Sequence, residues 1–196
     1  MKPIANWNEV KAFSATQKLP AGAYVIKILA AEDREPHSQN NNTDYHFLTV
    51  SFDIADGEYI DYYAEDYKSQ TREDKRWKGT VNFFVPQGDG TPEDAKTARR
   101  FKSMTVAVEE SNTGYVWEWD EKSLKGKTVG CVFRDEEWEI GDKTGFTARP
   151  QYFISSSDVA QGKYTIPAPK LLKKAPTPIA AAPSYTELAN DDDLPF

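Results

Sequence analysis

The last six residues of the chain combine negative charge with an apolar anchor, which suits capture by another protein. They are Asp191, Asp192, Asp193, Leu194, Pro195 and Phe196. Adjacent aspartates repel one another, but they can steer a peptide toward a basic surface at low salt. Because Phe196 comes last, its ring and its α-carboxylate can enter one pocket together. We interpret residues 191–196 as a protein-interaction tip; the alternative is an ordinary solvated acidic tail.

This tip resembles the C-terminal tip of bacterial and phage single-stranded DNA-binding proteins, in which aspartates precede a hydrophobic residue, a proline and a terminal phenylalanine. In that family the tip docks replication, recombination and repair enzymes. The resemblance therefore implies that residues 191–196 recruit such enzymes.

A second group of residues could bind the single-stranded DNA itself. Residues 67–79 contain five basic and two acidic side chains, with an aromatic residue near each end. Basic groups can follow a phosphate backbone while rings stack on bases, each stacked base contributing about 1–3 kcal/mol. The predicted DNA-binding residues, from this segment and from the strands described below, are Tyr45, Phe47, Tyr62, Tyr67, Lys68, Arg72, Lys75, Arg76, Trp77, Lys78, Arg134, Trp138 and Arg149.

These residues also have a structural interpretation. Tyr45, Phe47 and Trp77 could pack under the N-terminal segment or in a dimer interface, and the basic side chains could pair with Glu73 and Asp74. The chain carries 24 basic and 31 acidic residues, a net charge of −7 at pH 7. An overall positive field therefore cannot hold DNA, and any contact must use a local basic surface and stacking.

The composition predicts one domain with a tail, without a metal or cofactor. The chain has 196 residues, 39% of them hydrophobic, which is enough for a core. The single cysteine, Cys131, has only His37 and His46 beside it, so we expect no disulfide and no zinc site, and Cys131 should fill the core. The sequence shows no membrane-spanning run and no signal peptide. We expect a cytoplasmic protein without membrane contact.

Apolar alternation predicts the first strands. Residues 23–30 follow a turn and are rich in β-formers. Residues 32–44 are polar and are expected to form a long exposed loop. Residues 45–54 alternate, which places Tyr45 and Phe47 on the outer face. The core face of this strand is expected to be Leu48, Val50, Phe52 and Ile54.

A turn at residues 56–57 predicts a third strand over residues 58–63, on which either Tyr62 or Tyr63 must point outward. Residues 80–85 could continue the same sheet after an insertion. Thr91, Pro92 and Asp94 form a helix-start pattern of N-cap, first-position proline and acidic residue, and Gly114 marks the end of this helix. Two further strands are expected over residues 127–135 and 146–155.

The order of three strands, one helix and two strands is that of an OB-fold, a five-stranded Greek-key barrel with a helix between its third and fourth strands. Other small α+β domains share this order. The start of the domain, with Leu19, Pro20, Gly22 and Tyr24, and the order of its predicted strands together resemble divergent phage and prophage single-stranded DNA-binding proteins. We therefore predict a mainly β, OB-fold-like domain over residues 1–164. Single strands bind OB-folds on the second and third strands, between the loops joining strands one to two and four to five.

Residues 165–190 are rich in proline and alanine and show no periodicity that could bury a face. We expect a disordered, extended linker that reaches up to about 3 Å per residue. Such a tether would hold the tip away from the domain.

Enzymatic activity is not expected. Asp94, Ala95 and Lys96 match the D/E-x-K element of metal-dependent nucleases, but they lie in the first turn of the predicted helix. The element requires a strand and a second carboxylate nearby, whereas acidic residues at a helix start suit the helix dipole. No phosphate-binding loop and no nucleophile elbow occur in the sequence.

The sequence thus predicts a protein that binds single-stranded DNA with little sequence preference during DNA replication, recombination or repair. The resemblance places it in the cytoplasm of a bacterial host, at the nucleoid. It would recruit enzymes through residues 191–196, and it could form a homo-oligomer. The alternative is an adaptor that does not bind DNA and mimics the tip to capture host enzymes.

Overall fold

The structure is a computed structural model that describes residues 18–40 and 42–172. The predicted tip at residues 191–196 and the predicted linker from residue 173 onward lie outside the described residues.

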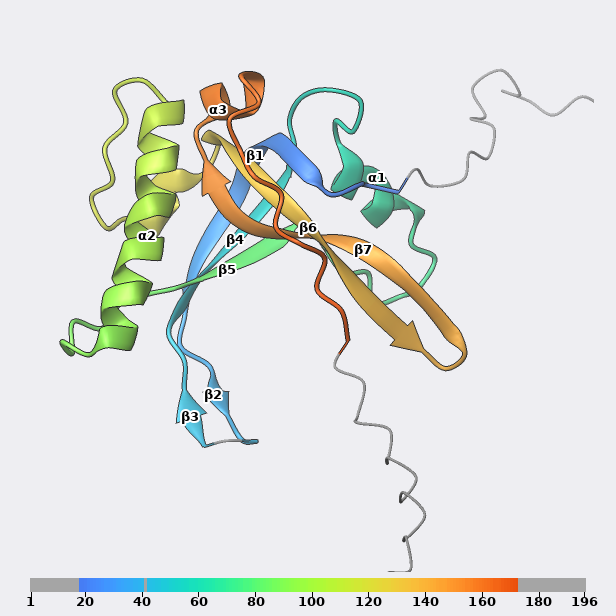
Figure 1. Cartoon of the computed structure of the whole chain (residues 1–196), viewed down its shortest axis with the longest axis horizontal. Helices are drawn as coiled ribbons and strands as arrows, with labels where there is room; N and C mark the ends of the chain where they lie inside the picture. The colour runs from blue at the N-terminus through green and yellow to red at the C-terminus, as the bar shows by residue number, and fades with distance from the viewer. Residues whose placement is uncertain (1–17, 41, 173–196) are drawn as a thin grey trace, which may run out of the picture.

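Five antiparallel strands form one sheet in the order β5-β4-β1-β6-β7 (Figure 1). They are β1 (Gly22–Arg34), β4 (Phe47–Ile54), β5 (Thr80–Phe84), β6 (Thr128–Ile140) and β7 (Lys143–Ile154). The described residues also contain helices α1 (Tyr62–Ser69), α2 (Pro92–Ser111) and α3 (Ser156–Ala160), and a 3₁₀ turn, η2 (Glu121–Leu124). The prediction of a mainly β fold is confirmed.

The sheet curls until its two edge strands face each other, but it does not close. Phe83 of β5 and Phe153 of β7 have ring centroids 4.8 Å apart. No backbone ladder joins β5 to β7 within the described ranges. The predicted closed barrel is therefore wrong for this chain, because side chains bridge the last gap where hydrogen bonds would be needed.

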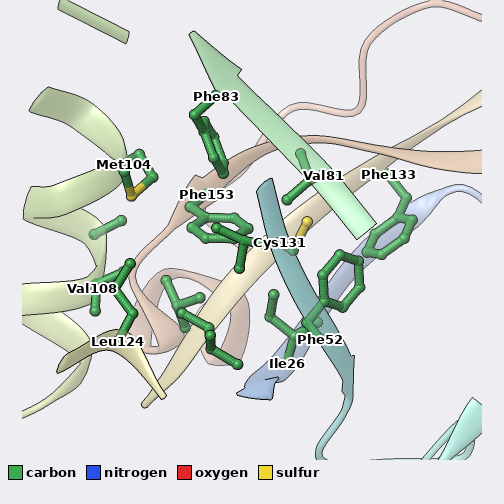
Figure 2. Close-up of a cluster of buried hydrophobic side chains, with 14 of the residues drawn as sticks. Ile26, Phe52, Val81, Phe83, Met104, Val108, Leu124, Cys131, Phe133 and Phe153 are labelled. Carbon is green, nitrogen blue, oxygen red and sulfur yellow. The ribbon is translucent and has the colours of Figure 1, made fainter. Parts of the chain in front are cut away.

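The core lies between the curled sheet and α2. All four residues predicted for the inner face of residues 45–54 are at most 3% exposed, which confirms the alternation. Figure 2 shows Met104 and Val108 projecting from α2 into the same core as Phe52 and Cys131. Cys131 is fully buried as predicted, and burial raises the pKa of its thiol.

Helix α2 begins as its sequence predicts. The Thr91 hydroxyl accepts a hydrogen bond from the Asp94 N–H at 3.1 Å, and Pro92 occupies the first turn, where its missing N–H costs nothing. Gly114 follows the helix with a φ of 79°, in the left-handed region that glycine adopts readily. Both helix signals were local, so the sequence alone could locate this element.

Helix α1 occupies part of the third strand predicted over residues 58–63, and that prediction is wrong. The Asp53 carboxylate, at the end of β4, accepts hydrogen bonds from the N–H groups of Tyr63 and Ala64, both at 2.9 Å. N–H groups in the first turn of a helix have no partner within the helix. Asp53 therefore caps α1 from a neighbouring strand and fixes where the helix starts.

The long loop predicted over residues 32–44 is also partly wrong. Strand β1 continues to Arg34, and β2 (His37–Ser38) pairs with β3 (Thr43–Asp44) to form a short ladder. This ladder projects from one end of the sheet, at the connection between β1 and β4 (Figure 1).

The first residues of the predicted linker are packed on the domain. The Tyr152 hydroxyl donates to the Thr165 carbonyl at 2.7 Å. The Lys170 N–H donates to the Asp135 carbonyl, and the Glu137 N–H donates to the Lys170 carbonyl, both at 2.9 Å. Residues 165–172 thus cross β7 and reach β6, so the domain extends beyond the expected boundary at residue 164. In the described part of the chain, no helix is long and apolar enough to cross a membrane.

Candidate nucleic-acid interface

Three aromatic side chains gather on the outer surface of β4 and β5, and we call Tyr45, Phe47 and Phe84 the aromatic platform. Phe47 and Phe84 are paired neighbours in the β4–β5 ladder, with ring centroids 6.2 Å apart. The Tyr45 and Phe84 rings are also 6.2 Å apart. Phe84 is 55% exposed, although burial of a phenylalanine is the norm. The rings thus offer aromatic surface to a ligand.

Strand geometry explains why the platform faces outward. Alternate side chains of a strand point to opposite faces, so Phe47 points away from the side of buried Leu48, as predicted. On β5, Val81 and Phe83 are buried, and Phe84 faces outward. Phe84 was not among the predicted site residues. The alternation in residues 80–85 identifies its face, but only the strand pairing places it beside Phe47.

Several acidic side chains lie close to the platform, and each has a basic neighbour. Arg34 Nη2 lies 3.2 Å from Glu32, and Arg34 is the ladder partner of Phe47. His46 Nε2 lies 2.7 Å from Asp33. The Arg34–Glu32 pair carries no net charge, but Asp33 keeps its negative charge where His46 is neutral. Any binding at the platform must therefore depend on stacking more than on charge.

The predicted basic segment, residues 67–79, lies at the other end of β4, on α1 and the loop after it. Tyr67 is 38% exposed, and Lys75 Nζ lies 5.7 Å from the centre of its ring. Three of the five basic side chains lie beside acidic groups: Lys68 near Glu65 at 3.5 Å, Arg76 near Asp74 at 3.4 Å, and Lys78 near Asp66 at 2.9 Å. The cations of these pairs are at least half exposed, so a phosphate could replace their partners.

Trp77 is held inside this segment. Its indole N–H donates to the carbonyls of Phe52 at 3.2 Å and Gly79 at 3.0 Å. Its ring packs 6.4 Å from Tyr63 and 5.9 Å from Tyr67. These contacts give Trp77 a structural role that neither interpretation predicted: it anchors the segment to β4.

Tyr62 also differs from its predicted position, because it lies on α1 and not on an outer strand face. Its ring packs on Tyr63 at 5.1 Å, and its hydroxyl accepts a long hydrogen bond from the Leu19 N–H at 3.4 Å. Tyr62 is partly buried against the core. It lines a hollow of about 310 Å³ between α1 and β7, together with three cations, Lys18, Lys78 and Arg149, and one acid, Asp66.

The remaining predicted residues lie on the hairpin of β6 and β7. Arg134 is the ladder partner of Arg149 and lies 2.8 Å from Glu136, with a quarter of its side chain exposed. Trp138 is paired with Gly145, where an added Cβ would come within 2.8 Å of the indole ring. Glycine is thus required for the ring to cover the neighbouring strand.

The structure therefore divides the predicted site into separate groups. Tyr45 and Phe47 form the platform with Phe84 at one end of β4, while Lys78 of the basic segment and Arg149 line the hollow at the other end. The exposed residues Thr80 and Asn82 connect the two along β5, where the four residue steps from Thr80 to Phe84 span about 13 Å. Within the described ranges, no group of three or more His, Cys, Asp and Glu side chains could hold a metal ion.

Comparison with known proteins gives no relative for this chain: no protein-family model and no curated protein sequence matches it. Any functional conclusion therefore depends on the site itself.

Proposed function

We propose that this protein binds single-stranded DNA with little sequence preference, and that it recruits replication, recombination or repair enzymes through residues 191–196. The observation that carries the DNA-binding proposal is the aromatic platform of Tyr45, Phe47 and Phe84. Stacking on aromatic rings is tolerant of sequence because every base has a π-face. Such a surface suits a net acidic chain, which has no overall positive field to hold a duplex.

The strand order supports the same proposal. If β1, β4, β5, β6 and β7 are the five strands of an OB-fold, α2 lies between the third and fourth of them, where that fold has its helix. We therefore propose that the domain is an OB-fold opened between its third and fifth strands. The platform then lies on the second and third strands, the usual surface for a single strand.

The recruiting role rests on the chemistry of the last six residues, which lie outside the described residues. Three carboxylates steer the tip toward a basic pocket, and Leu194 and Phe196 supply apolar side chains that can enter it. A tether that carries this tip would keep a bound enzyme at high effective concentration over the DNA.

A second candidate is the adaptor that binds protein through its body. Trp119 is 68% exposed and Val116 is 66% exposed, and the Trp119 ring stacks on Phe101 at 5.7 Å. Glu118 and Asp120 flank this surface. Exposed tryptophan is common at the centres of protein interfaces, and the acidic neighbours would repel DNA. This surface and the platform lie on different elements, so a protein-binding surface here would not block DNA at the platform, whereas the adaptor requires that the platform binds no DNA.

Fluorescence anisotropy of a labelled oligo(dT), titrated with the full-length chain, tests the DNA-binding proposal. We expect saturable binding that weakens about tenfold between roughly 50 mM and 200 mM salt, since few phosphates are neutralised. A duplex of the same length is the control and should bind far more weakly. Equal affinity for both would contradict a preference for the single strand, and no binding at micromolar protein would favour the adaptor.

A further inference from the structure

The two unpaired edges of the sheet enclose a pocket. It lies between β5 and β7, is bordered by α2, and has a volume of about 620 Å³. Pockets for small molecules commonly measure about 300–1,000 Å³. Because no ladder joins β5 to β7 over the described ranges, side chains line this gap. The opening in the sheet therefore provides space for a ligand.

Aromatic and apolar groups dominate the wall of this pocket. Phe83, Phe84 and Phe153 line it from the two edge strands, and Phe101 and Met104 line it from α2. Phe83 and Phe153 contact each other across the gap, so a ligand would lie beside this pair and against α2. The aromatic wall there favours a flat, aromatic ligand, because stacking adds to the burial of apolar surface.

The polar groups of the pocket wall indicate which polar groups the ligand carries. Arg100 is the only charged residue among the described residues that line the pocket, and Asn82 and Gln151 contribute side-chain amides. Gln151 Nε2 donates to the carbonyls of Arg149 and Pro150, at 3.2 and 3.1 Å. Arg100 and Asn82 are exposed. A guanidinium suits a phosphate, and an amide can pair with the edge of a nucleobase.

The pocket and the platform share one residue. Phe84 belongs to the platform by its contacts with Tyr45 and Phe47, and it also lines the pocket. A strand stacked on the platform would therefore pass the mouth of the pocket. A nucleotide unit has both features that the wall selects, a flat ring with a polar edge and a negative phosphate.

We propose that the pocket between β5 and β7 holds one nucleobase of the bound strand, with Arg100 contacting the adjacent phosphate. The inference deepens the proposed function and rests on it. It adds a specific insertion site to a surface that otherwise binds by stacking alone.

Met104 provides a direct probe of the pocket. The sequence contains two methionines, Met1 and Met104, and Met104 lines the pocket. In protein labelled with ¹³C at the methionine methyl groups, we expect oligo(dT) to shift the Met104 resonance through the ring current of the inserted base. Thymidine 5′-monophosphate at millimolar concentration should shift it in the same direction, and 2-deoxyribose 5-phosphate, which lacks the base, should not.

A pair of neighbouring arginines supplies matched variants. Arg99 and Arg100 are both exposed on α2, but only Arg100 lines the pocket. Arg100→Gln should weaken oligo(dT) binding about fivefold and reduce the Met104 shift, since it removes one phosphate contact. Arg99→Gln should change the affinity less than about twofold, because it loses only the general charge.

The outcomes separate this inference from the proposed function. Oligo(dT) that binds by anisotropy without moving the Met104 resonance would overturn the pocket and leave the proposed function standing. No binding by anisotropy would overturn both. A Met104 shift caused by deletion of residues 191–196 in the absence of DNA would overturn the inference in another way, because the pocket would then hold the chain's own tip.

Discussion

Joint replacement of Phe47 and Phe84 by alanine is expected to weaken oligo(dT) binding by about 30- to 100-fold. Each base that stacks on an aromatic side chain contributes roughly 1–3 kcal/mol, and the double variant removes two of the three platform rings. The fold should tolerate the change, because Phe84 is 55% exposed and Phe47 lies on the outer face of β4. The measurement is anisotropy at constant salt, with thermal unfolding recorded in parallel.

Trp119→Ala is the control for this prediction. Trp119 is at least as exposed as Phe84 and is also part of an aromatic cluster, but it lies on the acidic connection between α2 and η2. Its ring stacks on Phe101, which lines the pocket between β5 and β7, so its removal can reach the site only indirectly and should lower the affinity for oligo(dT) far less than loss of the platform rings. If the platform variant kept normal affinity, or if Trp119→Ala lowered it equally, the platform would not be the stacking surface.

Asp53→Ala is expected to lower the free energy of unfolding by about 3 kcal/mol. The carboxylate is 6% exposed and accepts hydrogen bonds from the N–H groups of Ile54, Tyr63 and Ala64, each at 2.9 Å. Alanine would leave buried donors unpaired, at roughly 1–3 kcal/mol each, with partial rescue by water. Urea denaturation followed by tryptophan fluorescence measures the change.

Asp56→Ala provides a comparison for Asp53→Ala, because Asp56 also accepts a backbone N–H, that of Gly57 at 2.7 Å, but is exposed. Its loss should cost less than about 1 kcal/mol. Equal costs for the two variants would mean that Asp53 does not cap α1.

The pKa of Asp53 determines in which direction its effect on folding stability changes with pH. Burial raises the pKa of its carboxyl, although the three backbone N–H groups oppose this. The folded state therefore holds the proton more tightly than the unfolded chain. Protonation of Asp53 therefore adds stability to the folded state, apart from the contribution of the three hydrogen bonds. This added stability is fully present below the unfolded pKa and is lost as the pH rises through the folded pKa.

Patterns of residues that are neighbours in sequence were sufficient to predict most of the strands and helix α2. The strict alternation of residues 45–54 identified β4 and its buried face, and the cap at Thr91 identified the start of α2. In both cases the determining residues are neighbours in sequence. The predicted strands at residues 23–30, 80–85, 127–135 and 146–155 likewise fall on β1, β5, β6 and β7.

The errors arise where distant residues decide the structure. Helix α1 depends on Asp53, which lies ten residues before Tyr63 in the chain, so the tyrosine-rich run alone could not reveal it. Residues 165–172 resemble a linker in composition, but Lys170 pairs with β6 through backbone groups that composition does not report. Phe84 joins the site only through its ladder with Phe47.

Photocrosslinking tests the central claim most directly, because it reports where a base lies. An oligo(dT) in which single thymines are replaced by 5-iodouracil would be irradiated in complex with the full-length chain, and the crosslinked peptides sequenced. We predict crosslinks at the platform residues Tyr45, Phe47 and Phe84. Crosslinks confined to the basic segment at residues 67–79, or none from an oligonucleotide that is demonstrably bound, would contradict this account of the site.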